Sequence, residues 1–306
     1  MTAGGRRTAR RRHVRREPGR RGTVQNRLRI VLMSYGAKGF ANLQAPCTEA
    51  GHETVAYVCA ASAAGAAVGD VLSQLPPGVD LLLPHSTAGL AHALSGYRPD
   101  LVVCNGFPWK LPAEVLRVPR LGVLNVHPSL LPRHRGPMPI HWAVRHGDPE
   151  TGVTIHWMDE SFDTGRILVQ RGGVVLPDDL DGDSVFAEIQ ALSRELLPEA
   201  LELAAGGHPG TPQDRDGATY EGLMGPLCAV IDWSASRRDV HDLVRTFRVG
   251  LFPVPGPLAV VDGRWVAVLK SRVEPGDGVR MECADGPLWI VESVPVPARD
   301  VWLSAG

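Results

Sequence analysis

Three polar side chains near the middle of the chain could carry out chemistry at a carbonyl carbon. Asn125 and His127 lie two residues apart in the apolar run Val123–His127, so in a β-strand they project from the same face. Asp163 follows a second apolar run, Gly152–Met158, in a Ser-Phe-Asp-Thr-Gly turn. The spacing predicts that an amide, an imidazole and a carboxylate meet at the ends of neighbouring strands, where open α/β sheets form crevices.

Each of these groups suits one part of the attack of an amine on a carbonyl. Asn125 can donate a hydrogen bond to an oxygen that gains negative charge. His127 belongs to the residue type that titrates near neutral pH and transfers protons. Asp163 can orient the imidazole, raise its pKa and accept a proton directly or through water. Such a set requires no covalent nucleophile.

Short motifs surround the trio in a fixed order. They run as Asn125-x-His127-x-Ser129-Leu130-Leu131-Pro132, Arg135-Gly136, Gly147-Asp148, Thr151-Gly152-Val153-Thr154 and Asp163-Thr164-Gly165. In order and spacing they closely resemble the folate-dependent formyltransferases, which include the methionyl-tRNA, glycinamide ribonucleotide and amino-sugar formyltransferases. The resemblance extends from about residue 27 to the C-terminus. It implies transfer of a formyl group from 10-formyltetrahydrofolate to an amine, with Asn125, His127 and Asp163 as the catalytic trio.

A second set of residues is expected to hold the formyl donor. The loop Asn105–Pro112 follows an apolar strand-like run and could wrap a flat aromatic ligand. In the family the equivalent loop helps to hold the pterin, and the segment 159–162 covers its other side. The resemblance therefore implies donor contacts from Phe107, Trp109, Lys110, Leu111, Asp159 and Phe162. The alternative for Phe107 and Trp109 is packing in the core.

Five histidines crowd the same region, but their spacing predicts no metal site. They are His127, His134, His141, His146 and His156. None forms an HExxH motif or another compact ligand pair. His134 and His156 could line the pocket, and a structural role is favoured for His156. The five cysteines are scattered and odd in number, which predicts reduced thiols in the cytoplasm, and neither a disulfide scaffold nor a zinc site.

Strand and helix patterns alternate through the first two thirds of the chain. Strands are expected at 28–34, 54–59, 80–83 and 101–104, and helices at 41–50 and 88–94. This alternation predicts a Rossmann-like α/β fold with a doubly wound, mostly parallel sheet. An edge strand at 173–176 and a helix capped by Ser184 and ending near residue 203 are expected to follow. We divide the chain into a disordered basic tail (1–24), a catalytic domain (25–205), a linker (206–222) and a C-terminal domain (223–306).

The C-terminal domain is expected to be a small OB-like β-barrel. A helix at 235–247 precedes β-rich runs that are separated by Asp262-Gly263 and Asp285-Gly286, dipeptides typical of hairpin turns. Ile231-Asp232-Trp233-Ser234 and Arg245-x-Phe247 resemble the C-terminal part of methionyl-tRNA formyltransferases, where the barrel is OB-like. Arg245 and Phe247 could simply pack between the domains.

Charge bears on the choice of acceptor. Residues 1–24 carry nine arginines and one glutamate, a composition that predicts disorder. We favour a dispensable extension, or an upstream start codon, over a nucleic-acid-binding arm. Without these residues the chain has 23 basic and 32 acidic residues, a net charge of −9. An enzyme that grips tRNA is expected to display an excess of Lys and Arg.

The resemblance, like the net charge, argues against tRNA as the acceptor. Methionyl-tRNA formyltransferases carry a basic insertion after the second strand, whereas Ala60–Leu72 contains no Lys or Arg. The expected acceptor is therefore a small-molecule amine of specialised biosynthesis, either an amino sugar or an amino-acid derivative such as N-hydroxyornithine; tRNA is less favoured. A methionyl-tRNA formyltransferase and a formyltetrahydrofolate hydrolase remain the alternatives.

No apolar run approaches the ~20 residues that cross a bilayer, so no membrane partner is expected and the location is expected to be cytoplasmic. The oligomeric state stays open.

Overall fold

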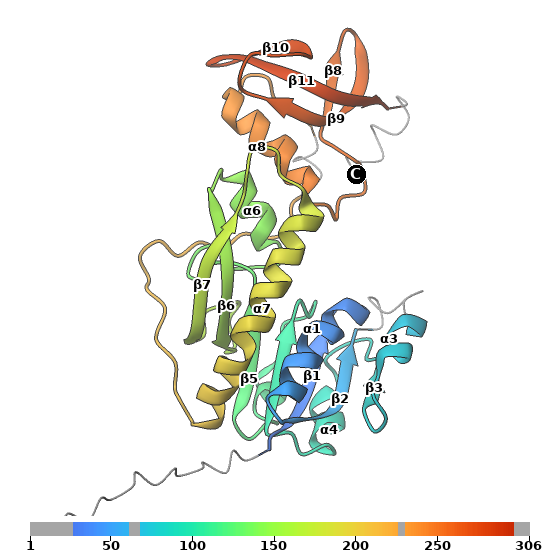
Figure 1. The fold of residues 1–306 in the computed structure, drawn as a ribbon, viewed down its shortest axis with the longest axis vertical. Coiled ribbons are helices and arrows are strands. Elements are labelled where there is room, and N and C mark those ends of the chain that lie inside the picture. The colour runs from blue at the N-terminus through green and yellow to red at the C-terminus, as the bar shows by residue number, and fades with distance from the viewer. Residues whose placement is uncertain (1–26, 61–67, 226–229, 297–306) are drawn as a thin grey trace, which may run out of the picture.

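The described part of the chain contains two separate β-sheets with helices packed around them (Figure 1). The computed structural model describes residues 27–60, 68–225 and 230–296. The predicted basic tail, 1–24, lies outside these residues, as does most of the segment Ala60–Leu72 that bears on tRNA binding. No helix in the described ranges is long and apolar enough to span a bilayer.

The larger sheet has seven strands in the order β3-β2-β1-β4-β5-β6-β7. β1 to β5 pair in parallel, and β6 and β7 add an antiparallel edge. The strands are β1 (Arg29–Ser34), β2 (Glu53–Cys59), β3 (Asp80–Leu82), β4 (Leu101–Asn105), β5 (Gly122–His127), β6 (Glu150–Trp157) and β7 (Ile167–Val175). The prediction of a mostly parallel α/β sheet is confirmed.

Helices cover both faces of this sheet. α1 (Gly36–Glu49), α3 (Val68–Gln74) and α7 (Gly182–Ala205) pack on one face, and α4 (Leu90–Ser95) and α5 (Ala113–Leu116) pack on the other. Strand side chains alternate between the two cores, as the pleat requires. Ile30 and Leu32 join the core under α1 and α7, whereas Val31 and Met33 join the core under α4 and α5. The sheet is therefore doubly wound.

Two helices begin earlier than the sequence predicts. α1 starts at Gly36, five residues before the expected start, because the positive φ of Gly36 (82°) turns the chain directly out of β1. α7 starts at Gly182, and its N-cap is Asp181 instead of Ser184. The Asp181 carboxylate accepts hydrogen bonds from the backbone N and the Oγ of Ser184, at 3.1 and 2.6 Å. Ser184 therefore lies inside the first turn, as the donor to the cap.

The edge strand is also longer than predicted. β7 spans Ile167–Val175, whereas only 173–176 was expected. Its middle residues Gln170 and Arg171 are exposed, since an edge strand offers one side to water. Because these two residues are polar, a search for apolar runs does not predict this part of the strand.

The smaller sheet is antiparallel and follows α8 (Arg237–Arg248). Its strands, in the order β10-β11-β9-β8, are β8 (Leu258–Val261), β9 (Arg264–Arg272), β10 (Val279–Cys283) and β11 (Gly286–Pro295). Both predicted hairpins are present. Asp262 and Gly263 have positive φ, as a type I′ turn requires; the second loop is Ala284-Asp285, one residue earlier than expected. Within the described ranges no pairing joins β8 to β10, so the closed OB-like barrel stays a prediction.

Arg245 connects the two sheets. Its buried guanidinium donates to the carbonyl oxygens of Leu176 and Pro177, at 2.6 and 3.0 Å, and pairs with the buried Asp242 carboxylate on its own helix. The expectation that Arg245 packs between the domains is confirmed. Phe247 instead belongs to the core of the C-terminal part and stacks on Phe252.

The predicted linker is docked against the larger sheet. We call residues 208–222, which return along β6 and β7 towards α6 (Pro139–Arg145) in Figure 1, the strap. Thr211 forms a β-bridge with Ile167, and Tyr220 forms one with Arg135. Its Gly- and Pro-rich composition predicts a linker, and its hydrogen bonds hold this segment along the edge of the candidate site.

Candidate active site

The predicted trio comes together at the carboxyl end of β5. Asn125 and His127 project from the face that carries α4 and α5, because they alternate with Leu124 and Val126, which lie in the core under α1 and α7. Asn125 Nδ2 donates to Asp163 Oδ1 at 3.1 Å, and His127 Nδ1 lies 3.6 Å from the same oxygen. The structure therefore brings an amide, an imidazole and a carboxylate together as the sequence predicts.

Local packing fixes the position of Asp163. The residue adopts a positive φ of 54° in the turn between β6 and β7. The Asp159 carboxylate shapes this turn by accepting hydrogen bonds from Ser161 N and Thr164 Oγ1, at 2.9 and 2.7 Å. A Cβ at Gly165 would lie 1.6 Å from the carbonyl oxygen of Trp157, so only glycine fits there. Close backbone packing thus requires the glycine of the Asp-Thr-Gly motif.

The Asp163 carboxylate is held in its charged form. Burial alone would raise the pKa of Asp163, but the neighbouring His127 and His156 and the backbone N–H of Gly136 outweigh burial and lower this pKa to about 2. Gly136 N donates to Asp163 Oδ2 at 2.9 Å. Asp163 is therefore ionised at neutral pH, and it places a negative charge in a largely buried site.

His127 is held in one tautomer. Its Nε2 atom lies 2.8 Å from the carbonyl oxygen of His134, which can only accept, so Nε2 carries the hydrogen. The lone pair of the neutral ring is then on Nδ1, which faces Asp163. Burial lowers the pKa of His127, although the Asp163 charge opposes this effect. At neutral pH the arrangement offers a neutral imidazole with Nδ1 free to accept a proton.

His156 is part of this constellation, although the sequence favoured a structural role. It lies opposite Asn125 in the antiparallel pair of β5 and β6. Its Nδ1 donates to the carbonyl oxygen of Trp157 at 2.8 Å, so its Nε2 is the acceptor for Asn125 Nδ2 at 3.3 Å. Sequence reasoning missed this contact because it depends on the register between two strands.

A rigid loop presents the backbone groups that hold His127 and Asp163. Thr154 Oγ1 donates to the carbonyl oxygen of Ser129 at 2.6 Å, and Gln170 Nε2 donates to that of Leu131 at 2.8 Å. These bonds fix the Ser-Leu-Leu-Pro motif against β6 and β7. The chain that continues from it carries the His134 carbonyl and the Gly136 N–H to the site.

Gln213 of the strap is a second residue that the sequence did not reveal. Its Nε2 donates to the carbonyl oxygens of Asp163 and Gly165, both at 2.8 Å, and its Oε1 accepts from Arg135 Nη2 at 2.7 Å. One side chain therefore ties the Asp163 turn to the loop after β5. A residue in a Gly- and Pro-rich segment carries no sequence signal for such a role.

The residues predicted to hold the donor lie on two segments that meet. Phe107 and Trp109, in the loop after β4, contact each other edge to face with ring centroids 5.4 Å apart. Lys110 Nζ lies 5.5 Å from the centroid of the Phe162 ring, which is 46% exposed. The structure thus brings the 105–112 loop against the Asp163 turn, with aromatic and cationic groups at the contact.

Two of these residues use their side chains for contacts within the protein. The Asp159 carboxylate is occupied in its own turn. The Leu111 side chain is buried in the core under α4 and α5, so only the backbone at this position could border a ligand.

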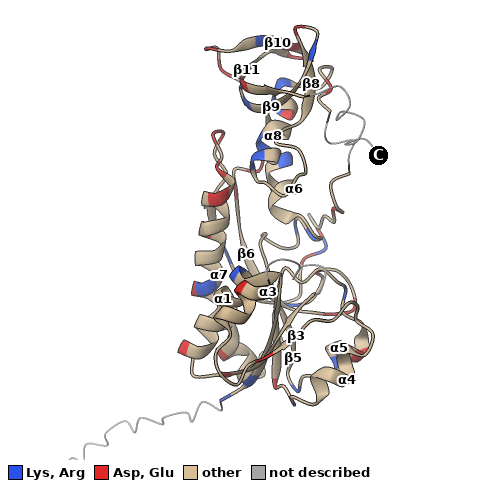
Figure 2. Ribbon diagram, turned by 90° about the vertical axis from the view of Figure 1, so that its right-hand side faces the viewer, with Lys and Arg blue, Asp and Glu red and all other residues tan. Residues whose placement is uncertain are grey.

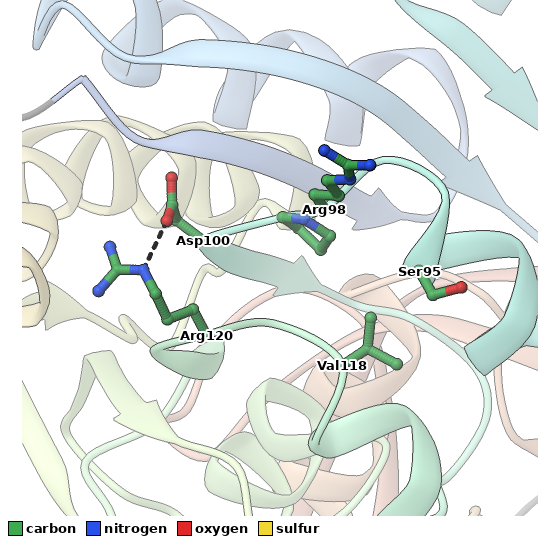
Figure 3. A pocket seen from close by; sticks show the side chains of 6 residues that line it. Ser95, Arg98, Asp100, Val118 and Arg120 are labelled. Carbon is green, nitrogen blue, oxygen red and sulfur yellow. Dashed lines mark hydrogen bonds and ion pairs between the residues drawn. The ribbon is translucent and has the colours of Figure 1, made fainter.

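A surface pocket of about 410 Å³ lies at the opposite end of the sheet (Figure 3). Asp100, which precedes β4, accepts hydrogen bonds there from Arg120 Nε at 2.7 Å and from Arg29 N at 2.9 Å. These bonds join the amino ends of β1 and β4 to the residues before β5. We regard the Asp100–Arg120 ion pair as structural, because it lies at the amino ends of the strands and the trio lies at the carboxyl end of β5.

Comparison with known proteins shows that this chain is similar to formyltransferases. A family model described as formyl transferase matches residues 29–201. The methionyl-tRNA formyltransferase of Aromatoleum aromaticum is 42% identical over 167 residues, which cover 54% of this chain and 51% of that protein. The methionyl-tRNA formyltransferase of an Anaeromyxobacter strain is 35% identical over 241 residues, which cover 72% and 76%. The alignments span about half to two thirds of the length of the first three such relatives.

Solved structures share the fold at low sequence identity. A sugar N-formyltransferase from a Shewanella species matches 79% of this chain and 96% of its own, with a TM-score of 0.62 and 20% identity. HypX from Aquifex aeolicus, solved in complex with tetrahydrofolic acid, matches 90% of this chain and 47% of its own, with a TM-score of 0.59 and 23% identity.

Proposed function

Since this chain belongs to the formyl transferase family, whose model matches more than half of it, we propose that it transfers a formyl group from 10-formyltetrahydrofolate to an amine. The observation that carries the proposal is that Asn125 Nδ2 and His127 Nδ1 lie 3.1 and 3.6 Å from the same oxygen of the largely buried Asp163 carboxylate. We assign 25–205 to the catalytic domain, 206–222 to a linker that includes the strap, and 223–306 to an OB-like domain.

The roles of the trio follow from their protonation states. An amine that attacks a formyl carbon must lose a proton, and the formyl oxygen gains negative charge. His127 accepts the proton at Nδ1, and the Asp163 carboxylate stabilises the imidazolium that results. Both amide hydrogens of Asn125 are directed at Asp163 Oδ1 and His156 Nε2. Asn125 can therefore stabilise the oxyanion only by exchanging one of these partners.

The donor is proposed to lie between the 105–112 loop and the Asp163 turn. Aromatic edges with a lysine ammonium beside them suit a flat ring system that bears a carboxylate tail. Phe107, Trp109, Lys110 and Phe162 would contact it with side chains, Leu111 with its backbone, and Asp159 by shaping the turn. The tetrahydrofolate complex of a protein with a similar fold supports this ligand class.

We propose that the acceptor is an amine of a small metabolite, an amino sugar or an amino-acid derivative such as N-hydroxyornithine. Arg133, Arg145 and Arg238 form ion pairs with Asp148, Asp239 and Asp178. Beside the Asp163 turn, Arg135 donates to the Gln213 side chain, and Arg166 donates to the backbone carbonyl oxygen of Pro209. Figure 2 shows basic and acidic residues interspersed around α8. Paired arginines have little charge left for phosphates, which favours a small amine of specialised metabolism over tRNA.

Methionyl-tRNA formyltransferase activity is the second candidate. The names of the curated relatives favour it, at 42% and 35% identity. The identities of these relatives and the charge of this chain point to different acceptors, so the choice needs an assay.

Donor turnover with an acceptor panel tests the proposal. The full chain is supplied with 10-formyltetrahydrofolate, and tetrahydrofolate release is followed without acceptor and then with amino sugars, N-hydroxyornithine or methionyl-tRNA. Release that depends on a small amine is expected. Release that depends on methionyl-tRNA alone would replace the acceptor assignment, and equal release without any acceptor would indicate a hydrolase. The variant His127→Gln is the matched control for contaminating activity.

A further inference from the structure

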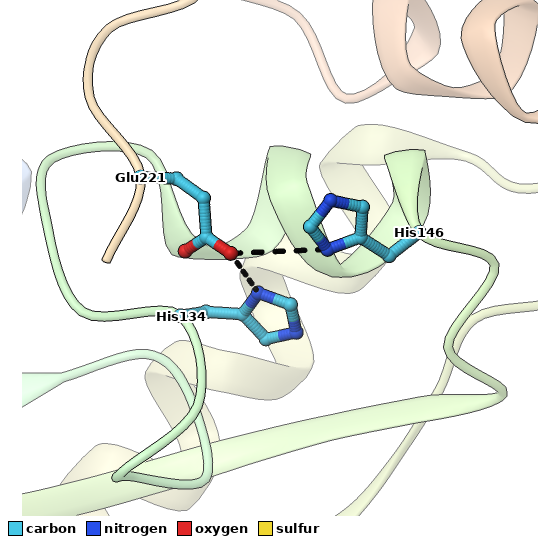
Figure 4. A group of neighbouring side chains, drawn as sticks. All are labelled: His134, His146 and Glu221. Atoms are coloured by element: carbon cyan, nitrogen blue, oxygen red, sulfur yellow. Dashed lines mark ion pairs between the residues drawn. The ribbon is translucent and has the colours of Figure 1, made fainter. Parts of the chain in front are cut away.

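Two histidines and a glutamate gather beside the candidate active site (Figure 4). His134 lies in the loop after β5, His146 follows α6, and Glu221 belongs to the strap. His134 Nδ1 and His146 Nδ1 lie 3.7 and 3.8 Å from Glu221 Oε1. The ligand atoms of the three residues all lie within 4.8 Å of one another. None of these residues has a role in the proposed reaction beyond the His134 carbonyl.

One ring nitrogen of His134 has a hydrogen-bond partner and the other has none. Its Nε2 lies 2.9 Å from Asp148 Oδ2, and a carboxylate can only accept, so Nε2 carries the hydrogen. In the tautomer that carries its hydrogen on Nε2 alone, Nδ1 presents a lone pair to the Glu221 carboxylate. The His134 side chain is 3% exposed, and its Nδ1 and Glu221 Oε2 are buried without a hydrogen-bond partner. Two electron-pair donors thus face each other across a gap that a cation would fill.

We propose that His134, His146 and Glu221 bind a divalent transition-metal ion of the Zn²⁺ type. Two imidazole nitrogens and one carboxylate form a donor set that suits Zn²⁺, and a fourth position remains for water. Ideal tetrahedral coordination separates such ligand atoms by about 3.3 Å, so the observed gaps must close by a few tenths of an ångström and, for the widest, by more. His146, whose side chain is 42% exposed, can move to close them.

Asp148 completes the arrangement as a positioning residue. Histidine ligands usually donate their other N–H to a carboxylate, which fixes the tautomer and strengthens the ligand. His134 makes this contact with Asp148, and Arg133 Nη2 holds the same carboxylate through both oxygens, at 2.7 and 2.9 Å. His134 is therefore presented to the site in the tautomer that binds metal through Nδ1.

A metal at this position would fasten the strap to the active-site loop. The His134 carbonyl holds His127, and the Gly136 N–H holds Asp163. Gly136 also lies so close to the strap that a Cβ would be 2.1 Å from the Glu221 carbonyl oxygen. The metal would thus stabilise the backbone groups that orient the trio, without contacting the reacting atoms. Spacing along the sequence carries no signal for this proposed site, because its three residues come from separate segments.

Titration calorimetry of the chelator-treated full chain with Zn²⁺ tests the proposal. We expect one equivalent per chain to bind and to raise Tm by about 5 °C at a Zn²⁺ concentration well above Kd. His146→Ala and Glu221→Gln are each expected to weaken binding by at least about 100-fold. The control variant His92→Ala removes an exposed histidine of α4 and should bind like the unaltered chain.

Co²⁺ substitution gives an independent readout of the same site. Four-coordinate Co²⁺ absorbs strongly in the visible range, and we expect His146→Ala to abolish this band. Circular dichroism establishes that each variant is folded. Failure of the unaltered chain to bind Zn²⁺ in a saturable way, or equal binding in His146→Ala and Glu221→Gln, would overturn the proposal. These measurements do not depend on formyl transfer, so they stand apart from the test of the proposed function.

Discussion

The Nδ1 atom of His127 lies 3.6 Å from the Oδ1 atom of Asp163. This distance is too long for a hydrogen bond, and with the ring hydrogen on Nε2 no proton lies between the two atoms. A proton that arrives at Nδ1 would convert the contact into an ion pair between groups that are both largely buried. The pair is therefore arranged to receive a proton during the reaction, and it does not hold one beforehand.

Replacement of His127 should separate catalysis from donor binding. His127→Gln keeps a hydrogen-bond donor for the His134 carbonyl but removes the basic nitrogen, so we expect turnover to fall by about 10²- to 10⁴-fold. The affinity for the folate should change little, because no residue predicted to contact the folate is altered. Steady-state turnover and tetrahydrofolate binding measure the two effects, with His92→Ala as the control. More than a tenth of the original turnover in His127→Gln would contradict the assigned role.

The pH dependence of the rate follows from the same pair. Burial lowers the pKa of His127 below its ordinary value near 6.5, so Nδ1 is already available at neutral pH. The rate should nevertheless rise through neutral pH, because an aliphatic amine acceptor must itself lose a proton before it attacks. A pH profile of kcat, with chemistry shown to be limiting, checks this. A flat profile between about pH 6 and 9 would argue against direct attack by the amine.

Asp163 should make stability sensitive to acid. Its pKa is lowered from 3.8 to about 2 in the folded chain, so the unfolded chain binds the proton more readily. The contribution, about 2 kcal/mol, is complete above pH 4 to 5 and is lost as the pH falls towards 2. Urea unfolding at pH 5 and pH 3 should show that Asp163→Asn loses about 1 kcal/mol less than the unaltered chain over this interval. Equal losses would contradict the pKa assignment.

Local patterns predicted the trio but not its supports. Asn125 and His127 could be placed on one face from their spacing alone, and motif order brought Asp163 to the same end of the sheet. The contact of His156 with Asn125 depends on the register between β5 and β6, which spacing within one strand cannot specify. Gln213 lies in a segment whose composition predicts a linker, and its role exists only once the strap has docked.

Gln213 should position the Asp163 turn without touching substrate. Gln213→Glu keeps an acceptor for Arg135 but removes the donor to the Asp163 and Gly165 carbonyls. We expect kcat to fall by about 10- to 100-fold, since small displacements of reacting groups are costly. Asp214→Ala, at the exposed neighbour, should have little effect. Unchanged kcat in Gln213→Glu would show that the strap does not set the geometry of the turn.

Two arginines of α8 should differ sharply in their effects on stability. Arg245→Met leaves the buried Asp242 carboxylate without this ion-pair partner and removes the donor to the Leu176 and Pro177 carbonyls, so we expect the free energy of unfolding to fall by about 3–5 kcal/mol. Arg248→Met breaks a pair with Asp179, which is 83% exposed, and should cost no more than about 1 kcal/mol. Urea unfolding of the two variants compares them on one helix. Similar losses would mean that Arg245 does not stabilise the junction between the two sheets.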